Sequence, residues 1–170
     1  MYPINLNNFP DGFELIDDKV KFDPKKHLRL EKPSEIYTLK DLGYSEEVVN
    51  NSPVDFAATS VFRVLSNEGS EILLDVTKKL EKFTTSSPRI PRNVRGGVYR
   101  SKFLRDLCLC DEISIFLSDI AGINLSPHTI PHQLGHLNYN PLEIGKNVDK
   151  WHVDTLMFDY VMFVTDPKKI

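Results

Sequence analysis

The sequence lacks the features that mark secreted, membrane-spanning and strongly charged proteins. No apolar run approaches the ~18–20 residues that cross a bilayer, and the N-terminal residues do not read as a secretory signal. The two cysteines, Cys108 and Cys110, are too close together to suggest a disulfide framework. The formal net charge of −3 offers no general attraction to nucleic acid. These absences predict a cytoplasmic protein with free thiols and without membrane or nucleic acid partners.

Length and composition predict one globular domain with an irregular arm in front of it. The chain has 170 residues, of which 41% are hydrophobic and 26% charged, an ordinary balance for a globular protein. Residues 1–35 are rich in Pro, Asp, Asn and Lys, which favours an irregular arm with one short strand around residues 13–22. Residues 36–170 show no repeat and no convincing internal boundary.

Helical periodicity is clearest in residues 66–83. The apolar side chains of this segment recur on one face, and they are Ile72, Leu73, Val76, Leu80 and Phe83. Shorter helices are predicted over residues 102–110 and 111–121, the second with Asp111 as N-cap and Gly122 just past its end. Residues 84–99, with two prolines, a Gly-Gly pair and several arginines, predict a loop.

Two strands are predicted after the helices. In residues 132–140 an extended chain places polar side chains on one face, at His132, His136, Asn138 and Asn140. These side chains would line a polar pocket or, alternatively, lie on an exposed edge strand. The segment after Asp154, LMFDYVMFVT, is apolar on both faces, which favours a strand buried on both sides.

The second strand is preceded by His152, Val153 and Asp154. Residues two apart on a strand point to the same side, so the imidazole and the carboxylate would lie together. A 2-His-1-carboxylate site binds Fe(II) with two such ligands and a further imidazole. The other interpretation is a structural hydrogen bond between His152 and Asp154 at a strand end.

The run DKWHVDTLMFDYVMFVTDP resembles the metal-binding strand of Fe(II)/2-oxoglutarate-dependent oxygenases. The similarity is to the phytanoyl-hydroxylase-like branch and the related amino-acid hydroxylases and halogenases. It extends over roughly residues 40–170 and includes Arg95-Gly96, Ser101-Lys102-Phe103, the SDIAG run at 118–122 and GHLN at 135–138.

The resemblance implies an α+β fold with a partial double-stranded β-helix (jelly-roll) and N-terminal helices packed outside the sheet. It implies Fe(II) and 2-oxoglutarate as cofactors, with His152 and Asp154 as catalytic metal ligands. His136 and Asn138 would help to bind 2-oxoglutarate. Related halogenases have Gly at the carboxylate position, so Asp154 favours hydroxylation.

The arginine loop is either a solvated basic loop on the surface or a clamp for a carboxylate, and the second interpretation predicts a small-molecule substrate resembling a carboxylic acid or an amino acid. An arginine can hold a carboxylate through two parallel hydrogen bonds. Arg95 is favoured for this role because Gly96 and Gly97 would let the backbone approach a ligand closely. Trp151 is the second residue expected to contact the substrate.

The chain departs from the family after Asp154, since only sixteen residues follow that carboxylate. The family's second metal-binding His and its Arg or Lys for 2-oxoglutarate lie further on. The chain is therefore expected to be the N-terminal portion of an oxygenase domain or a naturally shortened member. The third imidazole would come from missing sequence, from His132 or His136, or from another chain. A shortened member would expose sheet edges, which favours a homo-oligomer, and the alternative function is a non-catalytic binding or assembly module.

Overall fold

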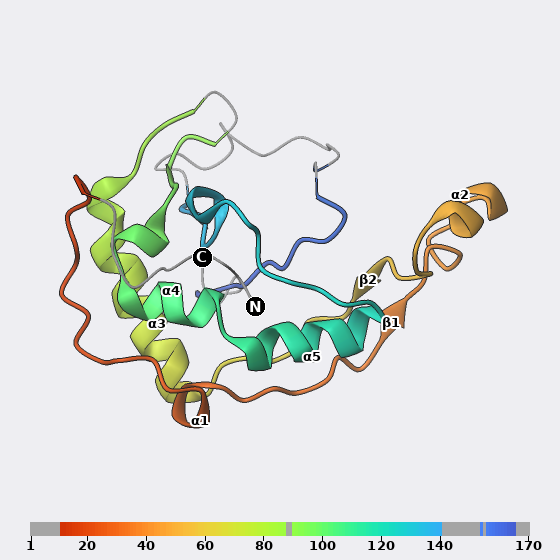
Figure 1. Ribbon diagram of the computed structural model, residues 1–170, viewed down its shortest axis with the longest axis horizontal. Helices are drawn as coiled ribbons and strands as arrows, with labels where there is room; N and C mark the ends of the chain where they lie inside the picture. Colours follow the sequence, from red (N-terminus) through yellow and green to blue (C-terminus); the bar gives the residue numbers. More distant parts are fainter. Residues whose placement is uncertain (1–10, 88–89, 141–153, 155, 166–170) are drawn as a thin grey trace.

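Helices build most of the body of the protein in the computed structural model, which describes residues 11–87, 90–140, 154 and 156–165. Three helices lie close together, α3 (Asn67–Leu80), α4 (Lys102–Cys108) and α5 (Asp111–Ala121) (Figure 1). Short 3-10 turns extend or join them at η1 (Glu81–Phe83) and η2 (Gly97–Tyr99). The periodicity prediction for residues 66–83 is confirmed, with Ser66 capping α3 through a bond from the Gly69 amide.

The core lies where α3, α4 and the chain before α3 meet. Leu80 of α3 and Phe103 of α4 are both fully shielded from solvent, and Phe22 packs edge-on against Phe103. Buried side chains of α5 continue the same cluster; they are Ile113, Phe116 and Ile120. Helical amphipathicity alone therefore accounts for most of the core, since each helix turns its apolar stripe inward.

Strand pairing is limited to two short antiparallel pairs among the described residues. One pair joins β1 (Ile36–Tyr37) to β2 (Ala58–Thr59), and the other joins β3 (Asn93–Val94) to β4 (Leu137–Asn138). The structure is thus mixed α and β, and no jelly-roll sheet is seen in the part of the chain that it describes.

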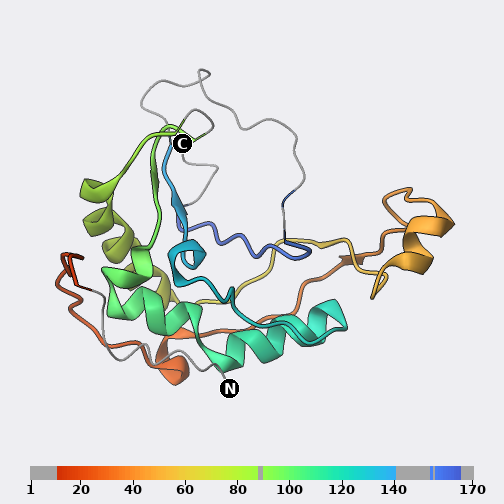
Figure 2. The same ribbon diagram turned by 45° about the horizontal axis from the view of Figure 1, so that its top comes forward.

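A projecting arm carries the first strand pair away from the helical body. It consists of β1, α2 (Glu46–Asn51) and β2, and α2 lies at its tip in both views (Figures 1 and 2). Ser45 caps α2, as its position before two acids predicts, but α2 buries none of its residues. The arm therefore contributes little to the core.

Several local predictions were wrong, each for a physical reason. No strand forms in residues 13–22; that segment crosses the body, followed by the one-turn helix α1 (Pro24–His27). The N-cap of α5 is Cys110, and Asp111 is instead its first helical residue. The predicted strand over residues 156–165 does not form: the segment begins with a bend at 156–157 and lacks a paired neighbour among the described residues.

Candidate functional site

The pair β3–β4 brings three of the candidate site residues together. Its register places Asn93 opposite Asn138 and Val94 opposite Leu137. One step further along the same register, Arg95 leaves β3 where His136 enters β4. Arg95 and His136, some forty positions apart in the sequence, thus adjoin the same end of a two-stranded ladder, and Asn138 pairs with Asn93 at its other end. Arg95, His136 and Asn138 form what we call the β3–β4 cluster.

Gly96 and Gly97, which follow Arg95, are approached closely by another part of the same chain, residues 132–135. Gly96 has a left-handed backbone, with φ of 66°, and its amide donates to the carbonyl of His132 at 2.9 Å. A Cβ on Gly97 would lie 3.3 Å from the carbonyl oxygen of Gly135. These glycines therefore let residues 132–135 pack closely against residues 96–97.

The arginines in and next to the loop of residues 84–99 make different contacts. Arg92 pairs with Glu81 and donates to the carbonyl of Asn140 at 2.9 Å. The guanidinium of Arg100 lies 3.9 Å from the centre of the Phe83 ring. Both are held in structural contacts. Arg95 is exposed, and its Nη1 donates to the side-chain oxygen of Gln133 at 2.7 Å.

The histidine segment is mostly not a strand, contrary to the prediction. Residues Pro131–Gln133 form a 3-10 turn, η3, and Gly135 turns the chain with φ of 61° before β4 begins. A proline at the start of a helical turn is well tolerated, since its missing amide would have no partner there. His132 is exposed on this turn, whereas His136 is half-buried with its Nε2 atom shielded from solvent. Asn138 is exposed in β4.

The predicted iron ligands are only partly described. Asp154 is exposed, while His152 and Trp151 lie outside the described residues. A carboxylate accessible to solvent has the right chemistry for a hard divalent ion. No group of three His, Cys, Asp or Glu side chains gathers in the described part of the chain. The described residues therefore supply one donor of the expected set and do not complete a metal site.

Sequence reasoning missed two residues around the β3–β4 cluster. One is Gln133, whose side-chain oxygen accepts a hydrogen bond from Arg95. Asn93 is buried, and its amide donates to the carbonyls of Thr85 and Ile90 at 3.3 and 3.0 Å. This closes the loop before β3. The signal available in the sequence was Asn93 itself, a polar residue directly before Val94 in a loop rich in turn-forming residues.

Tyr139 anchors the end of β4 to the helical body. Its hydroxyl donates to the carbonyl of Thr77 in α3 at 2.6 Å. Burial, and secondarily the carboxylate of Glu81, raises the pKa of Tyr139 to about 12. The phenol is therefore a fixed hydrogen-bond donor at neutral pH, which holds the cluster against α3.

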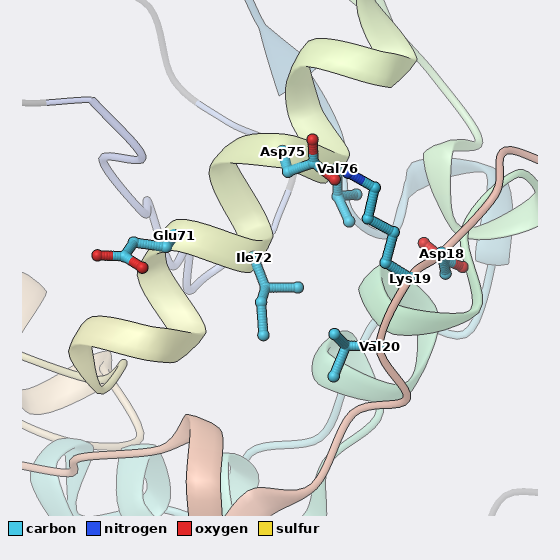
Figure 3. A pocket seen from close by; sticks show the side chains of 7 residues that line it. All are labelled: Asp18, Lys19, Val20, Glu71, Ile72, Asp75 and Val76. Carbon is cyan, nitrogen blue, oxygen red and sulfur yellow. The ribbon is translucent and has the colours of Figure 1, made fainter.

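A hollow of about 220 Å³ lies elsewhere, between α3 and the segment before α1 (Figure 3). Asp18, Lys19 and Asp75 line it together with Val20, Glu71, Ile72 and Val76. Asp75 is paired with Lys79 at 2.8 Å, and that hydrogen bond is the main cause of its lowered pKa. Asp75 thus serves a structural contact, and none of the predicted site residues lines this hollow.

Comparison with known proteins found no match to any family model, to any curated protein or to any solved structure. Among the described residues, no helix has the length and apolar character needed to cross a membrane.

Proposed function

We propose that the chain belongs to an Fe(II)/2-oxoglutarate-dependent dioxygenase that hydroxylates a small substrate resembling a carboxylic acid or an amino acid. The proposal rests on the His152-Val153-Asp154 run ahead of a long apolar segment, in the setting of the family resemblance. The jelly-roll expected for that family, completed by further strands, belongs to the same proposal. When bound, iron and 2-oxoglutarate would supply the oxygen chemistry, and the protein would position the substrate.

The β3–β4 cluster is the structural observation that supports this proposal. Arg95, His136 and Asn138 were chosen from the sequence; Arg95 and His136 flank one end of the β3–β4 pair, and Asn138 pairs with Asn93 at its other end. Arg95 has five N–H donors, and its Nη1 donates to the side-chain oxygen of Gln133 at 2.7 Å. A guanidinium held in this way is suited to a substrate carboxylate. In the proposal, His152 and Asp154 hold the metal and Arg95 orients the acid.

Metal binding tests the proposal directly. The full chain, prepared without metal, would be titrated calorimetrically with Mn(II) as a redox-inert substitute for Fe(II), and then with 2-oxoglutarate. We expect ordered binding, with 2-oxoglutarate bound only after Mn(II). Asp154→Ala should abolish Mn(II) binding and iron-dependent succinate formation, because it removes a charged ligand.

Asp159→Ala is the matched control for this experiment. Asp159 is also an exposed acid and lies five residues further along the same segment. It should bind Mn(II) as the wild type does. Equal Mn(II) affinity in wild type and Asp154→Ala, or no binding by the wild type at millimolar Mn(II), would refute the oxygenase assignment.

A second candidate function is a non-catalytic binding or assembly module. One observation favours it: no three metal-ligating side chains gather within the described residues. A wild-type chain that folds cooperatively yet takes up neither Mn(II) nor 2-oxoglutarate would support this alternative.

A further inference from the structure

The chain before α1 runs along the body beside α3 and α4, where it is drawn in red in both views (Figures 1 and 2). None of residues 11–21 is buried, so this stretch adds little to the core. Residues 13–17, which we call the strap, are held instead by individual contacts; Lys79 of α3, for example, donates to the carbonyl of Asp17 at 2.7 Å. The strap ends at Asp18, whose carboxylate is fixed at the first turn of α4.

One set of strap contacts is with η1, directly before the arginine loop of residues 84–99. The Lys82 ammonium donates to the Glu14 carboxylate at 2.6 Å. That hydrogen bond is the main cause of the lowered pKa of Glu14, so the carboxylate is charged at neutral pH. The Arg100 guanidinium lies 5.0 Å from the centre of the Phe13 ring, and it also contacts Phe83 of η1.

The other set of strap contacts is with the far end of the same loop. The rings of Phe13 and Tyr99 have their centres 4.8 Å apart. The Ile16 amide donates to the carbonyl of Arg100 at 2.8 Å, and Nη1 of Arg100 donates to the carbonyl of Glu14 at 3.2 Å. The strap therefore spans the base of the arginine loop and contacts the residues at both of its ends.

Tyr99 connects the strap to Arg95. A Cβ on Gly96 would lie 3.0 Å from Cδ2 of Tyr99 and 3.1 Å from Nδ1 of His132, so the Tyr99 ring packs on the residue that follows Arg95. The Tyr99 amide also donates to the carbonyl of Gly96 at 3.0 Å. The backbone beside Arg95 is thus held by a tyrosine that the strap itself contacts.

We propose that the strap fastens the base of the arginine loop, and that its release loosens residues 95–100 while the helical core stays folded. Asp18 would be the fixed end, and residues 13–17 the part that opens. Charged and aromatic groups near the surface hold the strap, so opening it costs less free energy than unfolding the whole chain. The strap would thereby regulate how firmly Arg95 is held. The proposal does not depend on iron or on the oxygenase assignment.

Amide hydrogen exchange of the full chain, resolved by residue with NMR, tests the strap. Phe13→Ala removes one aromatic pair and one cation–π contact, and it should speed exchange of the Ile16 and Tyr99 amides about five- to fiftyfold. The Gly96 amide should exchange at least about twofold faster, because it lies beyond Tyr99 in the same structure. The Val76 amide in α3 should keep its wild-type rate, because the core stays folded.

Leu15→Ala is the matched control, because Leu15 belongs to the strap but is 45% exposed. It should leave all four exchange rates unchanged. Salt gives a second test of the same contacts. Raising NaCl from about 0.1 M to about 1 M shortens the Debye length from about 10 Å to about 3 Å. This should speed exchange of the Ile16 amide in the wild type by screening the pair of Glu14 and Lys82, and it should have less effect in Lys82→Gln.

Several results would overturn the proposal. Unchanged exchange at Ile16 in Phe13→Ala would show that the ring does not hold the strap. Faster exchange at Ile16 alone, with Tyr99 and Gly96 unchanged, would show that the strap opens without loosening the loop. Equal acceleration at Val76 would show that the chain opens as a whole.

Discussion

Replacing Asp18 with alanine should destabilise the protein by detaching the N-terminal segment from α4. The Asp18 carboxylate accepts three hydrogen bonds there: from the Ser101 hydroxyl at 2.8 Å, the Lys102 amide at 2.6 Å and the Phe103 amide at 3.3 Å. The two amides belong to the first turn of α4, where backbone donors have no partner inside the helix. Asp18 therefore caps a helix that begins more than eighty residues later in the chain.

The size of the effect follows from these contacts. Loss of a capping side chain costs about 0.5–2 kcal/mol, and a negative charge at a helix N-terminus contributes about 0.3–1 kcal/mol. Ser101 is fully buried, so its hydroxyl would lose an acceptor away from water. We expect Asp18→Ala to lower the free energy of unfolding by about 2 kcal/mol. For a chain of this size that corresponds to a fall in Tm of about 4–8 °C.

Thermal and urea unfolding followed by circular dichroism measure this change. Asp17→Ala is the control, since Asp17 is the neighbouring exposed acid and Lys79 donates to its backbone carbonyl, which the substitution keeps. It should shift Tm by less than about 2 °C, as exposed surface substitutions usually do. If the two variants unfold at the same temperature, the Asp18 cap is not contributing and the reasoning fails.

Two further predictions concern packing and pH. Gly69→Ala should lower the free energy of unfolding, measured in urea, by about 1–3 kcal/mol, because the added Cβ would lie 2.3 Å from the His27 carbonyl oxygen. This clash outweighs the better helix propensity of alanine. The control is Ser70→Ala, one position further along α3, which should cost less. Burial raises the pKa of the Cys108 thiol to about 12 and, with the Glu112 hydrogen bond, that of Cys110 to about 11. Unfolded thiols ionise near pH 8.5, so the stability from burying neutral thiols is complete below that pH and is lost as pH rises towards 12. The urea concentration at the unfolding midpoint should decrease when the pH is raised from about 8 to about 10.5, and it should decrease less in Cys108→Ala than in the wild type. Equal decreases in the two proteins would contradict this prediction.

The candidate site was only partly predictable from the sequence. Arg95, His136 and Asn138 could be selected by residue type and by resemblance. Their meeting could not be predicted, because it depends on the pairing of β3 with β4 across forty residues. The packing of Gly96 and Gly97 against residues 132–135 could not be predicted for the same reason, since that loop is distant in sequence. His152 and Trp151 remain predictions, since they lie outside the described residues.

The sequence by itself determined the helices, because an amphipathic helix is encoded by the spacing of neighbouring residues. The apolar stripe of α3, its Ser66 cap and the Gly122 that ends α5 are all local signals. Only the tertiary structure decided which extended segments became strands and which stayed exposed. A strand exists through hydrogen bonds to a partner, and the apolar run of residues 156–165 has the composition of a buried strand without a described neighbour to pair with.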